Sequence, residues 1–169
     1  IDLNVEVETV LGFTESSIKS VKVRSQTRGD KFTSLDASGM FERNKPFRAV
    51  IETDANKARW FLSESQDAGQ IFKLVGFYPR AVGGVMNLQI NLDERGVAEK
   101  SGTLWARNFA VLGDSIVGDV MQNADTGQPA IAGKNRKKPA QELIPFDVMK
   151  IPFSVGNGQF FMNDAQIKG

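Results

Sequence analysis

Hydrophobic and polar residues alternate along most of the chain, with the two-residue period of strands that bury one face. The first such stretch covers residues 1–7, and the clearest later one covers residues 86–92. Turn sequences rich in Gly, Pro, Asn and Asp separate further stretches of this kind at residues 18–28, 32–41, 47–53 and 58–65. Short connections between such stretches predict an antiparallel meander.

The period changes to a helical one at residues 67–77, where Ile71, Phe72 and Val75 fall on one side. Asp67 is a suitable N-cap residue, and Gly76 with the later Pro79 ends the segment. We therefore expect a first short helix here.

Residues 100–125 combine both periods. In the first half the alternating residues are expected on one face of a strand, and they are Thr103, Trp105, Arg107, Phe109 and Val111. A second short helix is then expected at residues 115–123, with an apolar stripe formed by Ile116, Val117, Val120, Met121 and Ala124. A short helix that follows a strand directly is expected to rest on a curved sheet.

The sequence Gly156-Asn157-Gly158 lies between two apolar stretches near the end of the chain. Asn-Gly between alternating stretches is the strongest short hairpin signal. We expect a hairpin that joins residues 151–155 to residues 159–167. The chain is thus expected to be mainly β, with about eight strands and two short helices, in one domain spanning residues 1–169.

The composition removes most catalytic and metal chemistry. The 169 residues include no Cys and no His, so there is no thiolate nucleophile, no Ser-His pair and no sulfur-ligated metal site. The acidic pair Asp93/Glu94 is explained by turn chemistry, and neither glycine cluster has the pattern of a phosphate loop. We expect no enzyme, no metal site and no cofactor.

Charge and hydropathy limit the partners. The net charge of +1 argues against a general nucleic-acid binder, and no apolar run has the length of a membrane-spanning helix. The chain starts within a strand pattern without a Met and stops while a strand is under way. We expect it to be a piece of a longer protein.

Four segments, in order, resemble the AsmA-like family of bacterial envelope proteins. They are FLSESQDAG at residues 61–69, VGGVMNL at 82–88, a strand from Gly102-Thr103-Leu104 to Asn108-Phe109-Ala110-Val111, and the segment from Ile144-Pro145-Phe146-Asp147 to Ala165-Gln166-Ile167-Lys168-Gly169. The resemblance covers about residues 47–169 and places the chain in the C-terminal region of the family. Relatives usually have a more apolar connection where this chain has residues 126–142.

The resemblance implies a periplasmic protein that a segment outside this chain anchors in the inner membrane. It also implies a long curved antiparallel sheet with an open apolar groove that conducts phospholipid between the inner and outer membranes. The residues agree with such a groove in two ways. Two strands have one apolar face each, and most of the aromatic residues are Phe, which needs no hydrogen-bond partner.

We expect the acyl chains to lie against eight groove-wall residues, which are Leu88, Ile90, Phe109, Val111, Val117, Val120, Met121 and Phe153. Lipid headgroups would contact Lys134, Arg136, Lys137 and Lys138 in the polar segment 126–142. Ordinary alternatives exist for both sets, because a basic run is commonly a solvated loop and an apolar stripe is commonly core.

A second hypothesis comes from a different class of function. A sheet with open edges can pair with another chain, so the protein could be a structural or interaction scaffold of the cell envelope, and the isolated chain could dimerise through those edges. An exposed apolar concave face would favour lipid binding, whereas a fully covered core would favour the scaffold.

Overall fold

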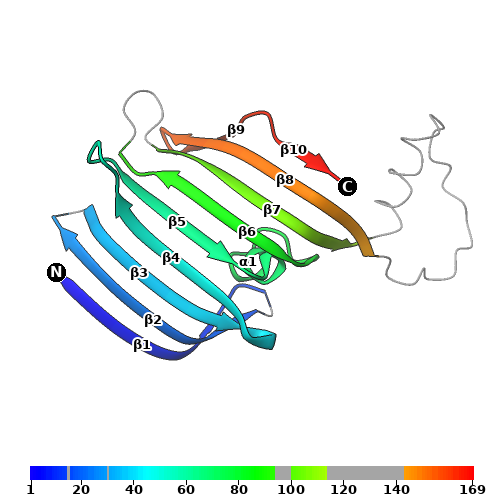
Figure 1. The fold of residues 1–169 in the computed structure, drawn as a ribbon, viewed down its shortest axis with the longest axis horizontal. Coiled ribbons are helices and arrows are strands. Elements are labelled where there is room, and N and C mark those ends of the chain that lie inside the picture. Colours follow the sequence, from blue (N-terminus) through cyan, green and yellow to red (C-terminus); the bar gives the residue numbers. More distant parts are fainter. Residues whose placement is uncertain (15, 30, 94–99, 114–142) are drawn as a thin grey trace, which may run out of the picture.

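The computed structural model describes residues 1–14, 16–29, 31–93, 100–113 and 143–169. Within these residues ten strands form one antiparallel sheet, in which β1 to β8 lie side by side in chain order (Figure 1). The strands are β1 (Asp2–Leu11), β2 (Ser17–Arg28), β3 (Lys31–Phe41), β4 (Lys45–Thr53), β5 (Arg59–Ser65), β6 (Ala81–Asn91), β7 (Lys100–Leu112), β8 (Leu143–Gly156), β9 (Gln159–Met162) and β10 (Gln166–Lys168). The sheet is open and does not close into a barrel, which confirms the expected mainly β, antiparallel fold.

The predicted hairpin is present at the end of the chain. Gly156 pairs with Gln159, and the two turn residues Asn157 and Gly158 have φ values of 52° and 72°. Positive φ at both central residues is the requirement of this tight turn, which Asn and Gly meet.

The second arm of this hairpin is not one continuous strand, as the sequence suggested. Phe153 pairs with Met162 but Lys150 pairs with Gln166, so the second arm carries one extra residue over this interval. Asp164 lies in the interruption and has a φ of 47°. The arm is therefore divided into β9 and β10, which both pair with β8.

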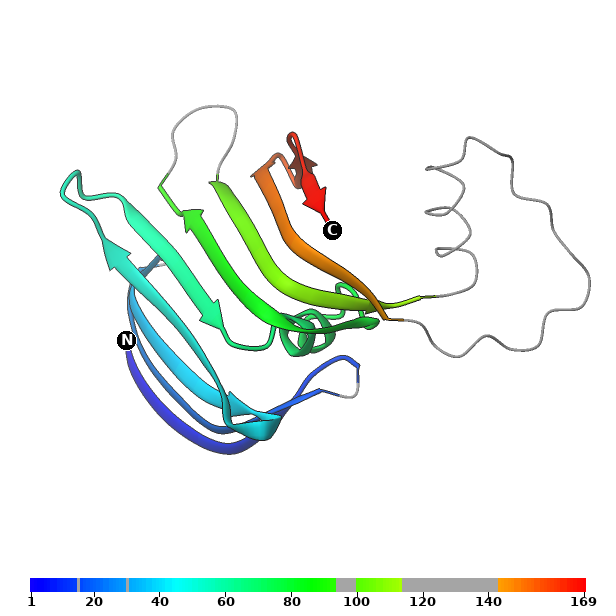
Figure 2. The same cartoon turned by 45° about the vertical axis from the view of Figure 1, so that its right-hand side comes forward.

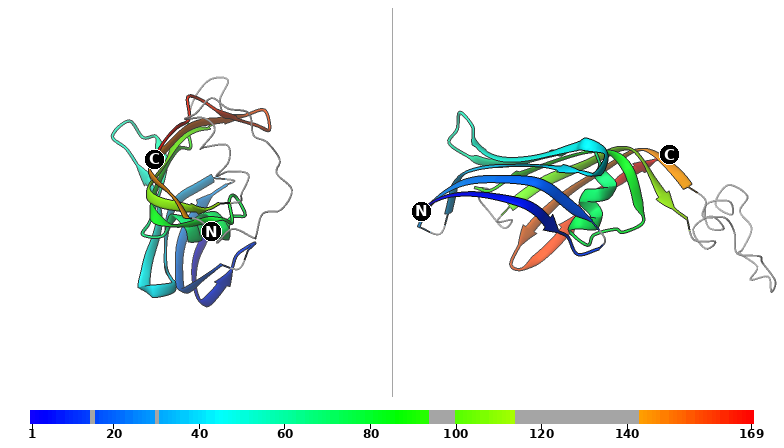
Figure 3. Two further views of the ribbon diagram at one scale, coloured as in Figure 1. Left: turned by 90° about the vertical axis from the view of Figure 1, so that its right-hand side faces the viewer. Right: turned by 90° about the horizontal axis from the view of Figure 1, so that it is seen from below.

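The sheet is strongly curved, and the described α-helix lies on its inner side (Figures 2 and 3). This helix, α1 (Ala68–Leu74), confirms the first expected helix. Asp67 is its N-cap, as predicted, and accepts a hydrogen bond of 3.0 Å from the backbone N–H of Gln70. The second expected helix lies outside the described residues. A 3₁₀ turn, η1 (Glu42–Asn44), joins β3 to β4.

One side of α1 approaches the start of β6 very closely. A Cβ atom added to Gly69 would lie 2.6 Å from the carbonyl oxygen of Ala81 and 2.8 Å from the Cα of Val82. A helix can come this near to a strand backbone only where the residue at the contact has no side chain. Gly69 therefore sets the distance between α1 and the sheet.

The other side of α1 is held by the connection between β1 and β2. Three groups of this connection donate hydrogen bonds to carbonyl oxygens of α1, and one acceptor, Leu74 O, belongs to the last turn, whose carbonyls have no partner within the helix. The bonds run from Thr14 Oγ1 to Lys73 O, from Phe13 N to Leu74 O and from Ser16 Oγ to Gln70 O, at 2.7, 3.1 and 3.1 Å. The helix is thus attached to two parts of the sheet that lie far apart.

A local break in strand geometry corrects one expectation. Asn108 in β7 has a φ of 52°, and Gly83 and Gly84 in the neighbouring β6 have φ values of 66° and 78°. The break changes the alternation, so Phe109 is buried in the same cluster as Ala106, three residues before it. Thr103, Trp105 and Arg107 therefore lie on the face opposite to Phe109 and Val111, although all five were expected on one face. The apolar pair Phe109 and Val111 is buried beneath α1.

The same glycines correct a boundary. The sequence predicted a strand at residues 86–92, after the two glycines, whereas β6 begins at Ala81 and contains both of them. A Cβ on Gly84 would lie 2.6 Å from the Cβ of Phe109 in the paired strand β7. The close pairing of β6 and β7 at this point therefore also depends on a residue without a side chain.

The buried core lies between α1 and the sheet. Its members come from the helix and from the inner side of five strands, and they are Ile18, Phe41, Ala68, Ile71, Phe72, Ala81, Met86, Ala106, Phe109, Val111, Met149 and Ile151. The core is thus concentrated at the part of the sheet that α1 covers.

Substitution of Gly69 by Ala tests whether the contact between α1 and β6 is as close as described. Helix propensity alone would make Ala the better residue by about 1 kcal/mol. The contact with the Ala81 carbonyl should reverse this sign and lower the free energy of unfolding by about 1–2 kcal/mol. Urea unfolding of both proteins measures the difference, and a stabilised variant would contradict the close approach.

Candidate functional site

Cross-strand pairing sorts the side chains of the sheet into two faces of different chemistry. One row of paired residues crosses eight strands and consists of Val5, Val23, Ala37, Ala49, Ser63, Leu88, Leu104 and Ile151. This row contains no charged residue, and it belongs to the face that α1 covers. We call this face the inner face.

The adjacent row, one residue along each strand, belongs to the opposite, outer face. Its members are Glu6, Lys22, Ser38, Arg48, Glu64, Asn87, Trp105, Lys150 and Gln166. Since successive side chains of a strand point to opposite faces, the two rows show a sheet that is apolar inside the curve and polar outside it.

The inner face contains an apolar cavity of about 330 Å³ beside α1. Its lining consists of side chains from α1 and the turn after it, from β4 to β8 and from β9. These residues are Phe47, Phe61, Ser63, Ile71, Phe72, Leu74, Val75, Phe77, Met86, Leu88, Leu104, Ile151, Phe153, Phe160 and Met162. Ser63 is the one residue of this lining with a polar side chain.

The floor and the rim of this cavity differ in exposure. Phe72 and Met86 on the floor are 3% and 2% exposed, so the sheet and the helix already cover them. On the rim, Phe77 is 58% exposed, Phe160 58% and Met162 60%. Large apolar side chains that converge around a cavity yet remain open to water are typical of a binding surface.

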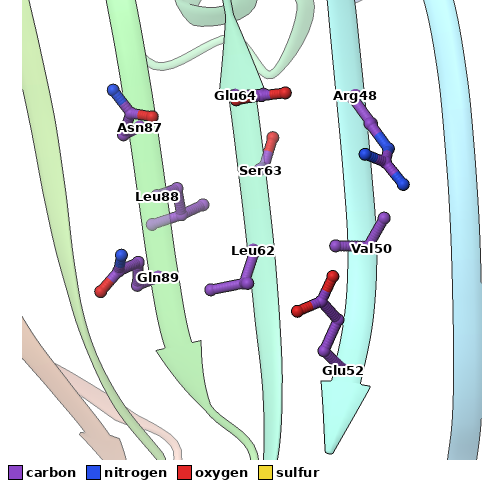
Figure 4. Close-up of a pocket in the computed structure, with 9 residues that line it drawn as sticks. All are labelled: Arg48, Val50, Glu52, Leu62, Ser63, Glu64, Asn87, Leu88 and Gln89. Carbon is purple, nitrogen blue, oxygen red and sulfur yellow. The ribbon is translucent and has the colours of Figure 1, made fainter.

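The outer face has a hollow of a different kind, with a volume of about 260 Å³ (Figure 4). Val50 and Leu62 form its apolar part, charged or amide side chains surround them, and Ser63 and Leu88, which also line the inner cavity, border it. The surrounding residues are Arg48, Glu52, Glu64, Asn87 and Gln89. Opposite charges and amides on neighbouring strands stabilise a solvated sheet surface, so this hollow is explained without a ligand.

A partly buried ion pair lies at the end of the sheet opposite α1. The guanidinium of Arg59 donates from Nε to Asp93 Oδ2 at 2.7 Å and from Nη2 to Asp93 Oδ1 at 2.5 Å. Arg59 also donates through Nη1 to the carbonyl of Phe32, so it connects β5 with the start of β3 and with the end of β6. The hydrogen bonds and positive charge of Arg59 lower the pKa of the Asp93 carboxyl to about 2.

No cluster of metal-ligating side chains accompanies these features in the described residues. Among them, no three Asp or Glu side chains come close enough together to hold a metal ion. No described helix has the length and apolar character needed to cross a membrane. The chemistry that the described part of the chain offers is apolar contact on the inner face.

The expected groove-wall residues have three different positions. Leu88 and Phe153 line the cavity, and Ile90 lies on the same face, two residues beyond Leu88. Phe109 and Val111 are 6% and 8% exposed and belong to the closed core. Val117, Val120 and Met121 lie outside the described residues.

The expected headgroup residues Lys134, Arg136, Lys137 and Lys138 also lie outside the described residues, as does the whole segment 126–142. The structure adds cavity residues that the sequence did not single out. Among these, Phe61 and Met86 could have been found from strand alternation. By contrast, the contribution of Phe77 depends on how α1 is placed, which no local pattern reveals.

Comparison with known proteins gives no relative: the chain matches no protein-family model, no curated protein and no solved structure. The geometry and chemistry of the inner face are therefore the basis on which a function is proposed.

The Arg59–Asp93 pair makes a prediction about pH. Because the pKa of Asp93 is lower in the folded chain than the ordinary 3.8, its contribution to stability is complete above about pH 4 and is lost as the pH falls through about 2. Asp93→Asn should lower the free energy of unfolding at neutral pH by about 1–2 kcal/mol, after allowance for solvent screening.

The variant should also lose less stability than the native chain between neutral pH and about pH 2. Asp36→Asn is the matched control, because Asp36 is 59% exposed and its nearest contact with Arg48 is 3.7 Å long. Urea unfolding at a series of pH values measures both variants. If Asp93→Asn and the native chain lost equal stability on acidification, the pair would not stabilise the fold.

Proposed function

We propose that this chain is a lipid-binding segment of an AsmA-like envelope protein, and that acyl chains of phospholipids lie along the inner face of its sheet. The observation that carries the proposal is the apolar cavity of about 330 Å³, whose rim residues stay more than half exposed. The full-length protein would be anchored in the inner membrane and would conduct phospholipid through the periplasm toward the outer membrane.

The chemistry of the cavity supports an acyl chain over other ligands. Its lining has a single hydroxyl, at Ser63, and no charged group. A polar ligand would lose its hydration there without gaining hydrogen bonds, which costs several kcal/mol per unpaired group. An acyl chain loses nothing of this kind and gains about 0.8 kcal/mol for each methylene group that it buries.

The distribution of exposure supports binding over closed packing. In a closed core the large side chains would be covered, as Phe72 and Met86 are. The rim instead leaves Val75, Phe77 and Phe160 more than half open to water. An occupant that covered these side chains would remove an exposed apolar patch, which is otherwise an aggregation hazard.

A pair of adjacent substitutions on opposite faces tests the proposal. Leu88→Glu places a charge in the cavity, whereas Gln89→Glu places the same charge on the outer face. Photo-crosslinking of a phospholipid with a reactive acyl chain should fall at least tenfold in Leu88→Glu, about the effect of 1.4 kcal/mol. Labelling of Gln89→Glu should be unchanged.

Circular dichroism shows whether both variants keep their strand content. If Leu88→Glu unfolds, the pair Phe160→Glu and Phe161→Glu replaces it, because both residues are about half exposed and only Phe160 lines the cavity. Equal lipid labelling of a folded cavity variant and its outer-face control would contradict acyl binding on the inner face.

The scaffold hypothesis retains one specific observation in its favour. In the described residues β1 pairs only with β2, so its other edge has no strand partner. Ile1 and Thr27 each donate a backbone hydrogen bond to the other's carbonyl oxygen, so they form a hydrogen-bonded pair of the antiparallel ladder. By the antiparallel alternation, the N–H groups of Asn4 and Glu6 then point away from β2. These groups could pair with a strand of a partner or of a second copy.

Asn4→Pro tests this alternative, because it removes an outward N–H and leaves the bonds to β2 in place. If the edge of β1 is an interaction site, sedimentation of the native chain should show self-association that Asn4→Pro reduces, with phospholipid labelling unchanged. Val5→Pro is the control that removes an inward N–H and should destabilise the sheet. A native chain that stays monomeric at high concentration would contradict pairing of two copies through this edge.

A further inference from the structure

On one side of the cavity, packed side chains fill the inner face. Toward the end of β7, the inner-face residues Phe109 and Val111 are buried in the same cluster as Phe72 of α1. Phe109 also stacks on Phe146, with ring centroids 5.2 Å apart. An apolar chain lying in the cavity therefore meets packed side chains in this direction.

The helix that separates these two regions is fixed at both sides. Gly69 lies against the backbone of Ala81, and the connection between β1 and β2 donates hydrogen bonds to Lys73 and Leu74 of the helix. Displacing α1 would break these bonds and expose the core residues beneath it. The helix is thus a wall of the cavity and is not held as a loose cover.

The wall offers no partner to a polar group. Five side chains of α1 and the turn that follows it line the cavity, and all are apolar: Ile71, Phe72, Leu74, Val75 and Phe77. A carboxylate or phosphate placed against them would be desolvated without compensation. The methyl end of an acyl chain carries no such cost.

We infer that α1 closes one end of the acyl site, so that an acyl chain binds with its methyl end against α1 and its polar end directed away from it. This inference rests on the proposed function. The cavity volume of about 330 Å³ holds roughly ten methylene groups, if each occupies about the 30 Å³ of a water molecule. The rest of a longer chain extends along the inner face past Ile90.

Two photoreactive forms of palmitic acid test this orientation. One carries a diazirine beside the terminal methyl group and the other carries it beside the carboxyl group. After illumination of the native chain, tandem mass spectrometry identifies the modified peptides. The methyl-end probe should label residues 68–78, and the carboxyl-end probe should label the far inner face around Phe61 and Ile90.

A pair of matched substitutions tests the role of the wall itself. Val75→Trp fills space at the cavity rim, whereas Val85→Trp adds the same bulk at a 38% exposed position that does not line the cavity. Val75→Trp should reduce methyl-end labelling of residues 68–78 several-fold, and Val85→Trp should leave it unchanged.

The outcomes separate this inference from the proposed function. If both probes label the inner face but the methyl-end probe labels residues 109–112, or if the two probes exchange positions, α1 is not the closed end and acyl binding stands. If neither probe labels the native chain above an unreactive control, both fail. An unlabelled native chain that sediments as a dimer, which Phe160→Glu dissociates and Asn4→Pro does not, would assign the cavity to a second copy and overturn both.

Discussion

The cross-strand register keeps apolar side chains on one side of the sheet, from Val5 in β1 to Ile151 in β8. A slip of one residue in any strand would move its apolar side chains to the solvent. The register therefore sets the polarity of both faces, and the curvature then encloses the apolar one. Among the described residues, a helix of seven residues covers part of this face, and the cavity with its exposed rim lies beside it.

Core and binding surface are continuous in this arrangement. Phe72 and Met86 belong to the packed cluster and also form the floor of the cavity. Phe77 and Phe160 form its rim and have no comparable cover. A ligand on the rim would thus extend the core, and its binding would stabilise the fold because it binds the folded chain alone. This coupling explains how a sheet that α1, the described α-helix, covers only in part can keep an apolar face.

Local signals predicted the elements of the fold, because each depends on residues close together in sequence. Strand alternation identified β1 and β6, Asp67 identified the start of α1, and the Asn157-Gly158 pair identified the hairpin. The errors also have a local cause that periodicity does not contain. Asn108 adopts positive φ and changes the alternation of β7, which places Phe109 in the core instead of on the outer face with Trp105.

The candidate site was less accessible to sequence reasoning, because it is assembled from distant segments. Leu88 and Phe153 were among the expected groove-wall residues, and both line the cavity. The wall formed by α1 depends on the contact of Gly69 with Ala81 and on bonds from Thr14, 59 residues away from Lys73. Likewise, Asp93 was attributed to turn chemistry, whereas its partner Arg59 lies 34 residues earlier. Contacts between residues so far apart in sequence do not produce a periodic pattern of hydrophobic and polar residues.

Native mass spectrometry of the chain purified without detergent tests the central claim most directly. The account predicts that part of the 18.5 kDa chain retains a ligand with the mass of a phospholipid or fatty acid, and that extraction with organic solvent releases it. A spectrum that contained only the bare chain, before and after incubation with phospholipid vesicles, would contradict the claim that the inner face binds acyl chains.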